Sequence, residues 1–290
     1  MQPMSTYRPR RSVLYMPAAN ERALEKAKDI QADALIFDLE DAVAPDSKEV
    51  AREQACAAAA SSEYGNRELT IRCNGLDTPW GKDDVLAAAA AGPAAVVIPK
   101  VDGSSYLDEI SELLNQGGAP SSTQIWAMVE TPIGILHVEE IARHERMSVM
   151  VLGTNDMAKE LRASITADRQ ALLPYLAMCL LSARAAGVAI LDGVYNDIKD
   201  ESGFKDVCVQ GAEMGFDGKT LIHPNQVAPT NEIFSPSLDE LDFYRRIIEE
   251  FEAAEKEGRG VLTVDGKMIE NLHVDEARRA LAVADAIAAL

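Results

Sequence analysis

The sequence is poor in cysteine, in long apolar runs and in positive charge. Its four cysteines include no C-x-x-C pair: Cys56, Cys73, Cys179 and Cys208. Small secreted domains carry a denser disulfide framework, so we expect reduced thiols and a cytoplasmic location. The apolar run after Arg11 is only about five residues long, which is too short for the core of a signal peptide. No apolar run approaches the roughly 18 residues of a membrane span.

The charge balance limits the partners that we expect. The chain has 28 basic and 47 acidic residues, which gives a formal net charge of −19. Such a surface repels phosphate backbones and anionic lipid, so we expect neither nucleic acid nor a membrane as a partner. A small anionic substrate would need a local cluster of Arg and Lys. The sequence also contains no Gly-x-Ser-x-Gly elbow, no P-loop and no dinucleotide-binding G-x-G-x-x-G.

What the chain does contain is an alternation of short apolar runs with longer Ala-rich amphipathic stretches. Continuous apolar strands that alternate with helices indicate a parallel sheet buried on both faces. Eight repeats favour a closed (β/α)₈ TIM barrel, although an open doubly wound sheet is the alternative. The eight runs are Ser12–Met16, Ala34–Leu39, Leu69–Cys73, Ala95–Lys100, Ile125–Glu130, Val149–Gly153, Val188–Asp192 and Thr220–His223.

Polar residues follow almost every predicted strand, and this observation favours the barrel. In a barrel the carboxyl ends of all strands meet at one mouth, where active sites are built. In an open sheet the same residues would spread along an edge. The residues are Asp38, Glu40, Asp41, Arg72, Asn74, Lys100, Glu130, Asn155, Asp156, Asp192 and His223.

We expect residues 1–230 to form the barrel and residues 231–290 to form a C-terminal helical extension. The extension contains a long charged helix over Leu238–Lys256, a Gly-rich turn with a strand-like piece (GRGVLTVDGK), and a last Ala-rich helix. Eight βα units do not need this segment. It would serve as a lid on the barrel mouth, or it would reach a neighbouring subunit.

Glu130 and Asp156 are the candidate metal ligands. Each follows an apolar strand, the two strands are sequential, and neighbouring strands lie roughly 5 Å apart. Carboxylates without Cys or His nearby favour Mg²⁺ or Mn²⁺ over zinc. The alternative is a pair of buried acids in salt bridges with Arg or Lys.

The cluster Asp38-Leu39-Glu40-Asp41 places three like charges close together, which is unusual because like charges repel at close range. They would accept hydrogen bonds from metal-bound water or hold Arg72; the alternative is an acidic helix N-terminus. Arg72 itself suits a bidentate grip on a carboxylate or a carbonyl. The alternative for Arg72 is a structural ion pair with Glu40 or Asp41, and both can hold at once.

Two further candidates carry weaker signals. Lys26 lies one turn from Arg22 on the first predicted helix, where the pair would either meet a phosphate or form a solvated face. His223 lies in an I-H-P-N-Q turn after the last strand. It would either present its imidazole to a ligand or bond to the backbone of its own turn.

Six segments, in order along nearly the whole chain, together carry a resemblance to a known family. They are RSVLYMP (Arg11–Pro17), FDLEDAVAPDSK (Phe37–Lys48), RCNGLDTPWG (Arg72–Gly81), VETPIG (Val129–Gly134), LGTNDMA (Leu152–Ala158) and GFDGKTLIHPNQ (Gly215–Gln226). The chain resembles the HpcH/HpaI aldolase–citrate lyase superfamily. Within it, the chain is most similar to the citrate lyase β-like branch, which includes malyl-CoA and citramalyl-CoA lyases and a malyl-CoA thioesterase.

The resemblance implies a (β/α)₈ barrel that assembles as a homotrimer or a dimer of trimers. It also implies Mg²⁺-dependent Claisen-type chemistry on acyl-CoA esters. By matching motif, Glu130 and Asp156 would bind the metal. Arg72 would hold the oxygen of the keto acid or of the thioester enolate, with Glu40 and Asp41 in support. The residues expected along the coenzyme A path are Tyr15, Lys26, Asn155 and His223.

The chain departs from the pattern at Glu270. In the lyases, an aspartate in a Met-Ile-Asp setting, donated by a neighbouring subunit, moves the proton at the acyl carbon. Here the setting is Met268-Ile269-Glu270, and the longer side chain moves the carboxylate by roughly an ångström.

The first hypothesis is therefore a lyase that cleaves a malyl-CoA-type 3-hydroxyacyl-CoA into an acyl-CoA and an α-keto acid. The alternative suggested by Glu270 is a malyl-CoA thioesterase. Further alternatives are a citrate lyase β-like subunit that acts on a carrier-protein thioester and a non-catalytic binding barrel.

Overall fold

Eight parallel strands form a closed barrel in the computed structural model, which describes residues 7–256 and 261–290. Each strand pairs with the next, and β1 pairs with β8 to close the cylinder. The predicted TIM barrel is confirmed, and the open sheet is wrong. The strands are β1 (Ser12–Pro17), β2 (Ala34–Asp38), β3 (Glu68–Arg72), β4 (Ala95–Ile98), β5 (Gln124–Val129), β6 (Met147–Leu152), β7 (Ala189–Asp192) and β8 (Gly218–Leu221).

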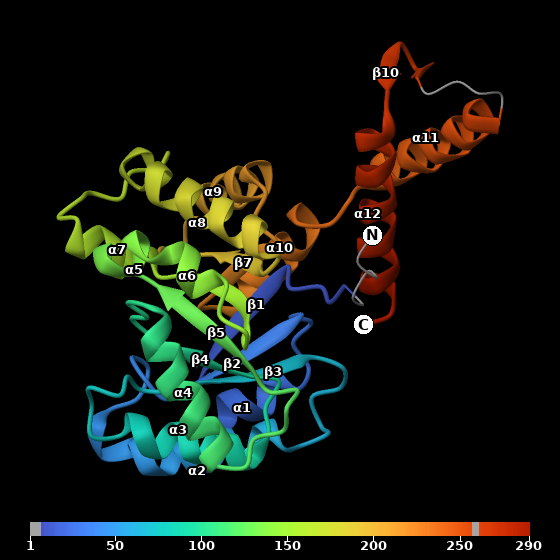
Figure 1. Cartoon of the computed structure of the whole chain (residues 1–290). Coiled ribbons are helices and arrows are strands. Elements are labelled where there is room, and N and C mark those ends of the chain that lie inside the picture. Colours follow the sequence, from blue (N-terminus) through green and yellow to red (C-terminus); the bar gives the residue numbers. More distant parts are fainter. Residues whose placement is uncertain (1–6, 257–260) are drawn as a thin grey trace. The chain divides into compact units, whose positions relative to one another are not determined.

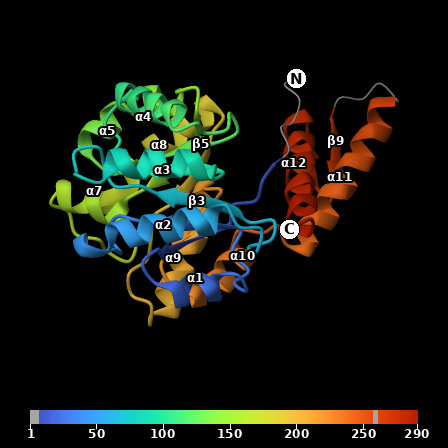
Figure 2. The same cartoon turned by 90° about the horizontal axis from the view of Figure 1, so that it is seen from below.

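Helices surround these strands, as Figures 1 and 2 show. The α-helices are α1 (Glu21–Ala27), α2 (Lys48–Ala59), α3 (Gly81–Ala91), α4 (Ser104–Gln116), α5 (Pro132–Leu136), α6 (Val138–Ala142), α7 (Thr154–Glu160), α8 (Leu173–Ala186), α9 (Glu201–Met214) and α10 (Val227–Ile233). Three short 3₁₀ turns are η1 (Pro45–Ser47), η2 (Gln170–Leu172) and η3 (Pro224–Gln226). The segment between β5 and β6 forms two short helices in place of one, because His137 leaves the helical region with φ −110° and ψ 11°.

Alternate strand residues fill the inside of the barrel. Val13, Ile36, Val97, Trp126 and Val149 are fully buried and belong to one apolar cluster. Because strand side chains point alternately to the two faces, the other positions pack against the helices. A filled barrel leaves only its mouth for a ligand.

The chain divides into two compact units. Arg10–Glu232 contains the barrel, and the second unit contains Ile233–Leu290 together with residues 7–9. The boundary expected between residues 230 and 231 lies two positions from this division.

The C-terminal segment has a core of its own. It contains α11 (Leu238–Lys256), β9 (Leu262–Val264), β10 (Lys267–Ile269) and α12 (Asn271–Ala288), which pack around Ile247, Phe251 and Val274. The Asp-Gly turn of the β9–β10 hairpin is left-handed at both residues, with φ 48° and 78°, as such a turn requires. The Gly-rich turn predicted before β9 falls on 258–260, outside the described residues.

No helix within 7–256 or 261–290 combines the length and the apolar character needed to cross a membrane.

Candidate active site

A cavity of about 310 Å³ lies at the carboxyl ends of the barrel strands. Its wall combines acidic, amide and apolar side chains that come from the ends of seven strands. The lining residues are Tyr15, Pro17, Asp38, Asp41, Ala42, Arg72, Met128, Glu130, Leu152, Gly153, Thr154, Asn155, Asp156, Val194, Asn196, Thr220 and Ile222. Six of the predicted strand-end residues therefore meet at this cavity: Asp38, Asp41, Arg72, Glu130, Asn155 and Asp156.

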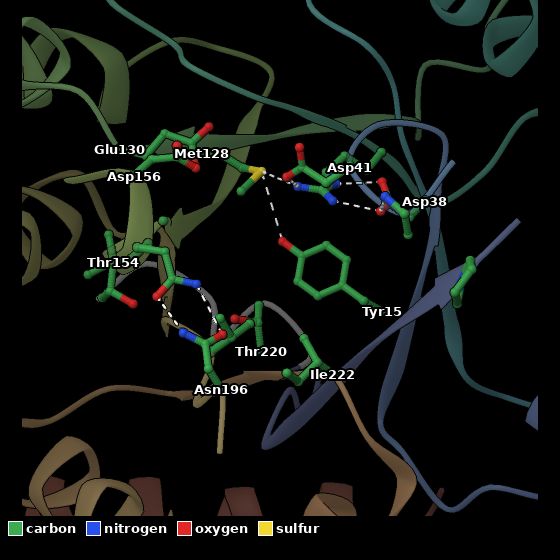
Figure 3. Close-up of a pocket in the computed structure, with 17 residues that line it drawn as sticks. Tyr15, Asp38, Asp41, Met128, Glu130, Thr154, Asp156, Asn196, Thr220 and Ile222 are labelled. Atoms are coloured by element: carbon green, nitrogen blue, oxygen red, sulfur yellow. Dashed lines mark hydrogen bonds and ion pairs between the residues drawn. The ribbon is translucent and has the colours of Figure 1, made fainter. Parts of the chain in front are cut away.

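Glu130 and Asp156 lie together on one side of this cavity (Figure 3). Glu130 is only 2% exposed, and its Oε1 accepts a hydrogen bond from the backbone N–H of Lys100 at 2.9 Å. Burial, then Glu40 and Asp156, raise the pKa of Glu130 to about 7. Within the described residues neither carboxylate forms an ion pair with Lys or Arg, so the salt-bridge alternative is not supported.

The donor set of this pair fits a hard divalent cation. Two carboxylate groups without a cationic partner are the ligands that Mg²⁺ or Mn²⁺ prefers. Across the described part of the chain, no group of three or more His, Cys, Asp and Glu side chains is arranged to hold a metal. The pair would thus leave most coordination positions to water and to a chelating substrate.

Gly153 makes room for Glu130. A Cβ atom at this position would lie 2.0 Å from Oε2 of Glu130 and 2.5 Å from its Cβ. The chain leaves β6 through Gly153 and enters α7, which begins at Thr154 and carries Asp156. A glycine is therefore needed where the two halves of the candidate metal site approach each other.

Asp38 and Asp41 line a second side of the cavity (Figure 3), where they and Glu40 hold Arg72. Its Nε and Nη2 each donate to Asp38 at 2.6 Å. Its Nη1 lies 2.8 Å from Glu40 and 3.3 Å from Asp41. Burial opposes the charge of Arg72, but these acids raise its pKa well above the ordinary value. Glu40 and Asp41 thus contact Arg72, which is one of the two arrangements expected for them.

Asp38, the first acid of the predicted cluster, is the main partner of Arg72, which is one of the two arrangements expected for that cluster. Asp38 and Arg72 end neighbouring strands and are directly paired in the β2–β3 register. Adjacent parallel strands bring such side chains onto the same face.

Tyr15 and Met128 lie between the two charged sides (Figure 3). The Tyr15 hydroxyl lies 3.9 Å from the Met128 sulfur, and the Arg72 guanidinium lies 4.7 Å from the centre of the Tyr15 ring. Burial raises the pKa of Tyr15. The tyrosine is therefore a neutral wall that stacks on a fixed cation.

The sequence and the fold are similar to those of known proteins. The family model for HpcH/HpaI aldolase/citrate lyase matches residues 11–224. The chain belongs to this family.

Members of the citrate lyase β-like branch match almost the whole chain. A (3S)-malyl-CoA thioesterase of Cereibacter sphaeroides is 50% identical over 281 residues, which are 97% of this chain and 96% of that protein. The citrate lyase subunit beta of Escherichia coli K12 is 37% identical over 284 residues, 96% of this chain and 94% of that protein. The chain is an enzyme of this branch.

Solved structures agree with the barrel. CitE from Mycobacterium tuberculosis, in complex with magnesium, acetoacetate and coenzyme A, is 27% identical with a TM-score of 0.78, over 94% of this chain and 98% of that one. A citrate lyase from Burkholderia xenovorans LB400 has a TM-score of 0.84 at 17% identity, covering 98% and 94%, and this likeness shows the fold alone.

The remaining residues predicted from the family pattern are spread over the molecule. Asn155 lines the cavity and exchanges two amide hydrogen bonds with Asn196, at 3.1 and 2.8 Å. Lys26 is exposed on α1, and it is not a lining residue. The roles proposed for both stay predictions.

His223 and Glu270 are both N-caps. His223 Nδ1 accepts the backbone N–H of Asn225 at 3.2 Å, which is the backbone-bonded arrangement considered as its alternative. Glu270 caps α12, and His273 in turn accepts the Glu270 backbone N–H. The proton-transfer role of Glu270 stays a prediction.

A second buried charge cluster lies where Asp192, the last residue of β7, pairs with Lys219 near the start of β8; of its members only Asp192 was expected, as a strand-end residue. Lys219 and Asp192 are fully buried, and Lys219 Nζ lies 2.9 Å from Asp192. Arg169 Nη1 donates to both Asp192 oxygens, at 2.7 and 2.9 Å. The two cations outweigh burial and lower the pKa of Asp192. Arg169 comes from the loop after α7, so nothing in the strand pattern pointed to it.

Proposed function

We propose that this enzyme hydrolyses the thioester bond of a malyl-CoA-type 3-hydroxyacyl-CoA. The observation that carries the proposal is the 50% identity to (3S)-malyl-CoA thioesterases over 97% of the chain. The citrate lyase β subunits are more distant, at 37% identity or less. These relatives favour the thioesterase alternative over the carbon–carbon lyase that was the first hypothesis.

We further propose that Glu130 and Asp156 hold Mg²⁺. The support is the pair of carboxylates without cationic partners, together with the magnesium in the complex of the M. tuberculosis relative. When bound, the ion would polarise the oxygens of a chelating substrate and make a bound water more acidic.

The size of the cavity supports a binding mode in which only the acid portion of the substrate lies inside it. Its volume of about 310 Å³ suits a short hydroxy acid but not a whole acyl-CoA, so the coenzyme A portion would extend outward. A related protein binds coenzyme A and acetoacetate together with magnesium, which is consistent with this binding mode.

Hydrolysis requires water to attack the thioester carbon, the C–S bond to break, and the leaving thiolate to take up a proton. The oxygen of the thioester carbonyl gains negative charge during the attack. Asp38 and Glu40 fix the orientation of Arg72, so Arg72 could donate to this oxygen in place of its longer, 3.3 Å contact with Asp41.

A carboxylate must accept the proton of the attacking water. Glu270 is the group proposed from the family pattern, acting in its own or in a neighbouring subunit of a homotrimer or a dimer of trimers. Glu40 is a second candidate within the barrel, because burial raises its pKa to about 7, near the optimum for a base at neutral pH.

A product assay tests the proposal. With malyl-CoA as substrate, the wild-type enzyme should release malate and free CoA. Glyoxylate and acetyl-CoA would instead establish the lyase, which the family and the citrate lyase relatives keep as the second candidate. Activity that needs an acyl carrier protein would support the citrate lyase β-like alternative. The Glu130→Gln variant is the control, because it should form neither set of products.

A further inference from the structure

Lys100 has an unusual backbone conformation beside the candidate metal site. It lies two residues beyond the end of β4, and its φ is +50°, in the left-handed region that residues with a side chain seldom occupy. The backbone N–H of Lys100 donates to Oε1 of Glu130 at 2.9 Å. Backbone strain of this kind concentrates at functional sites.

The ammonium group of Lys100 keeps its hydrogen-bond donors free among the described residues. The side chain is 57% exposed, and the carboxylate oxygen of its ion pair, Oε1 of Glu40, lies 3.9 Å away. That distance is too long for a hydrogen bond, and the Lys100 ammonium forms no hydrogen bond with any of the described residues. Arg72, in contrast, is 8% exposed and contacts three carboxylates.

The charges around Lys100 show why a free cation matters here. Glu40, Glu130, Asp156 and Asp41 all act electrostatically on its ammonium, and although burial lowers its pKa, these acids raise it on balance. A substrate carboxylate that enters this group of acids meets repulsion. A bound divalent cation relieves part of that repulsion, and a nearby ammonium with free donors relieves more.

We propose that Lys100, which does not itself line the cavity, extends its exposed side chain to the carboxylate of the short acid bound there, while its backbone N–H positions Glu130. This inference rests on the proposed function for the identity of the acid. The same cation chemistry would suit a phosphate of coenzyme A. The closeness of the ammonium to Glu40, and its interaction with Glu130 and Asp156, favour the acid that chelates at this pair.

Two neutral substitutions separate the side chain from the backbone. Asparagine tolerates the left-handed conformation, so Lys100→Asn removes the charge and keeps the N–H on Glu130. Valine is β-branched and resists this conformation, so Lys100→Val removes both. Lys100→Arg keeps the charge and serves as the conservative rescue.

The measurement is calorimetric titration with Mg²⁺ alone, then with malate on the Mg²⁺-saturated protein, and with free CoA. In Lys100→Asn we expect an unchanged CoA affinity and a malate affinity about tenfold weaker, the size of one charge-assisted contact. Its Mg²⁺ affinity should be at least that of the wild type, because a positive charge near the metal site is lost. Lys100→Arg should restore malate binding to within about threefold, and Lys100→Val should bind Mg²⁺ more weakly than Lys100→Asn does.

Three results would overturn the inference. The first is an equal malate affinity in wild type and Lys100→Asn, including no malate binding by either. The second is a loss of CoA affinity in place of malate affinity. The third is Mg²⁺ binding as strong in Lys100→Val as in Lys100→Asn. These titrations involve no thioester. A failure to hydrolyse malyl-CoA would therefore refute the proposed function without altering their outcome.

Discussion

Replacing Glu130 with glutamine should stabilise the metal-free protein at alkaline pH and remove its response to magnesium. The glutamine carbonyl can still accept the Lys100 N–H, so the packing and the hydrogen bond are kept. What disappears is a carboxylate that is 2% exposed and that lies beside Glu40 and Asp156.

The size and the sign follow from the pKa of Glu130. Folding raises it from 4.5 to about 7, so the folded state favours the protonated form. The loss of folding free energy caused by Glu130 is absent below about pH 4.5, where the group is protonated in both states. It grows with pH because the unfolded chain ionises first, and it is complete above pH 7. The shift corresponds to about 3 kcal/mol, or a rise in Tm of about 5 °C for the variant at pH 8.

Thermal unfolding with and without Mg²⁺ is the assay. At pH 8 without metal the Gln variant should melt above the wild type, and the gap should close as the pH falls toward 4.5. Added Mg²⁺ should raise the Tm of the wild type only, because ligand binding stabilises the state that binds it. A variant less stable than wild type at pH 8 without metal would show that Glu130 serves as a paired structural acid. Equal stabilisation of both proteins by Mg²⁺ would place the ion elsewhere.

Three other substitutions test separate parts of the site. Gly153→Ala places a Cβ 2.0 Å from Oε2 of Glu130, so kcat/KM should fall about 100-fold with weaker Mg²⁺ binding; normal titration curves would contradict this. Arg72→Lys loses the bidentate contact with Asp38, so the free energy of unfolding measured in urea should fall by about 3 kcal/mol. An unchanged midpoint would show that the three carboxylates do not need Arg72 for their stability. Glu270→Asp should shift products from malate toward glyoxylate; an unchanged product ratio would remove Glu270 from the proton transfer.

The sequence predicts the barrel well because its strands are continuous apolar runs at regular spacing. All eight runs contain strands, and each predicted limit lies within two residues of the observed one. An apolar run of four to six residues can also belong to a buried helix, so the regular alternation with longer amphipathic stretches is what identifies these runs as strands. The Glu130–Asp156 pair is predictable for the same reason, since each acid follows an apolar strand.

The contacts that the sequence does not reveal depend on backbone angles and on loops. The left-handed conformation of Lys100 is set by the turn after β4, and no residue type announces it. Arg169 reaches Asp192 from a loop whose path is fixed only by the folded barrel. His223 illustrates the reverse problem, because a residue of catalytic type serves to cap η3.

The tight packing of Gly153 on Glu130 has a consequence for how this enzyme can be redesigned. The strand ends of β2, β3, β5 and β6 interlock through Asp38, Arg72, Glu130 and Gly153, so changes there would disturb several partners at once. Another part of the cavity wall is formed by Val194, Asn196 and Ile222, which follow β7 and β8. Libraries that seek new acyl groups should vary this part of the wall, and natural divergence in substrate choice should concentrate on the same segments.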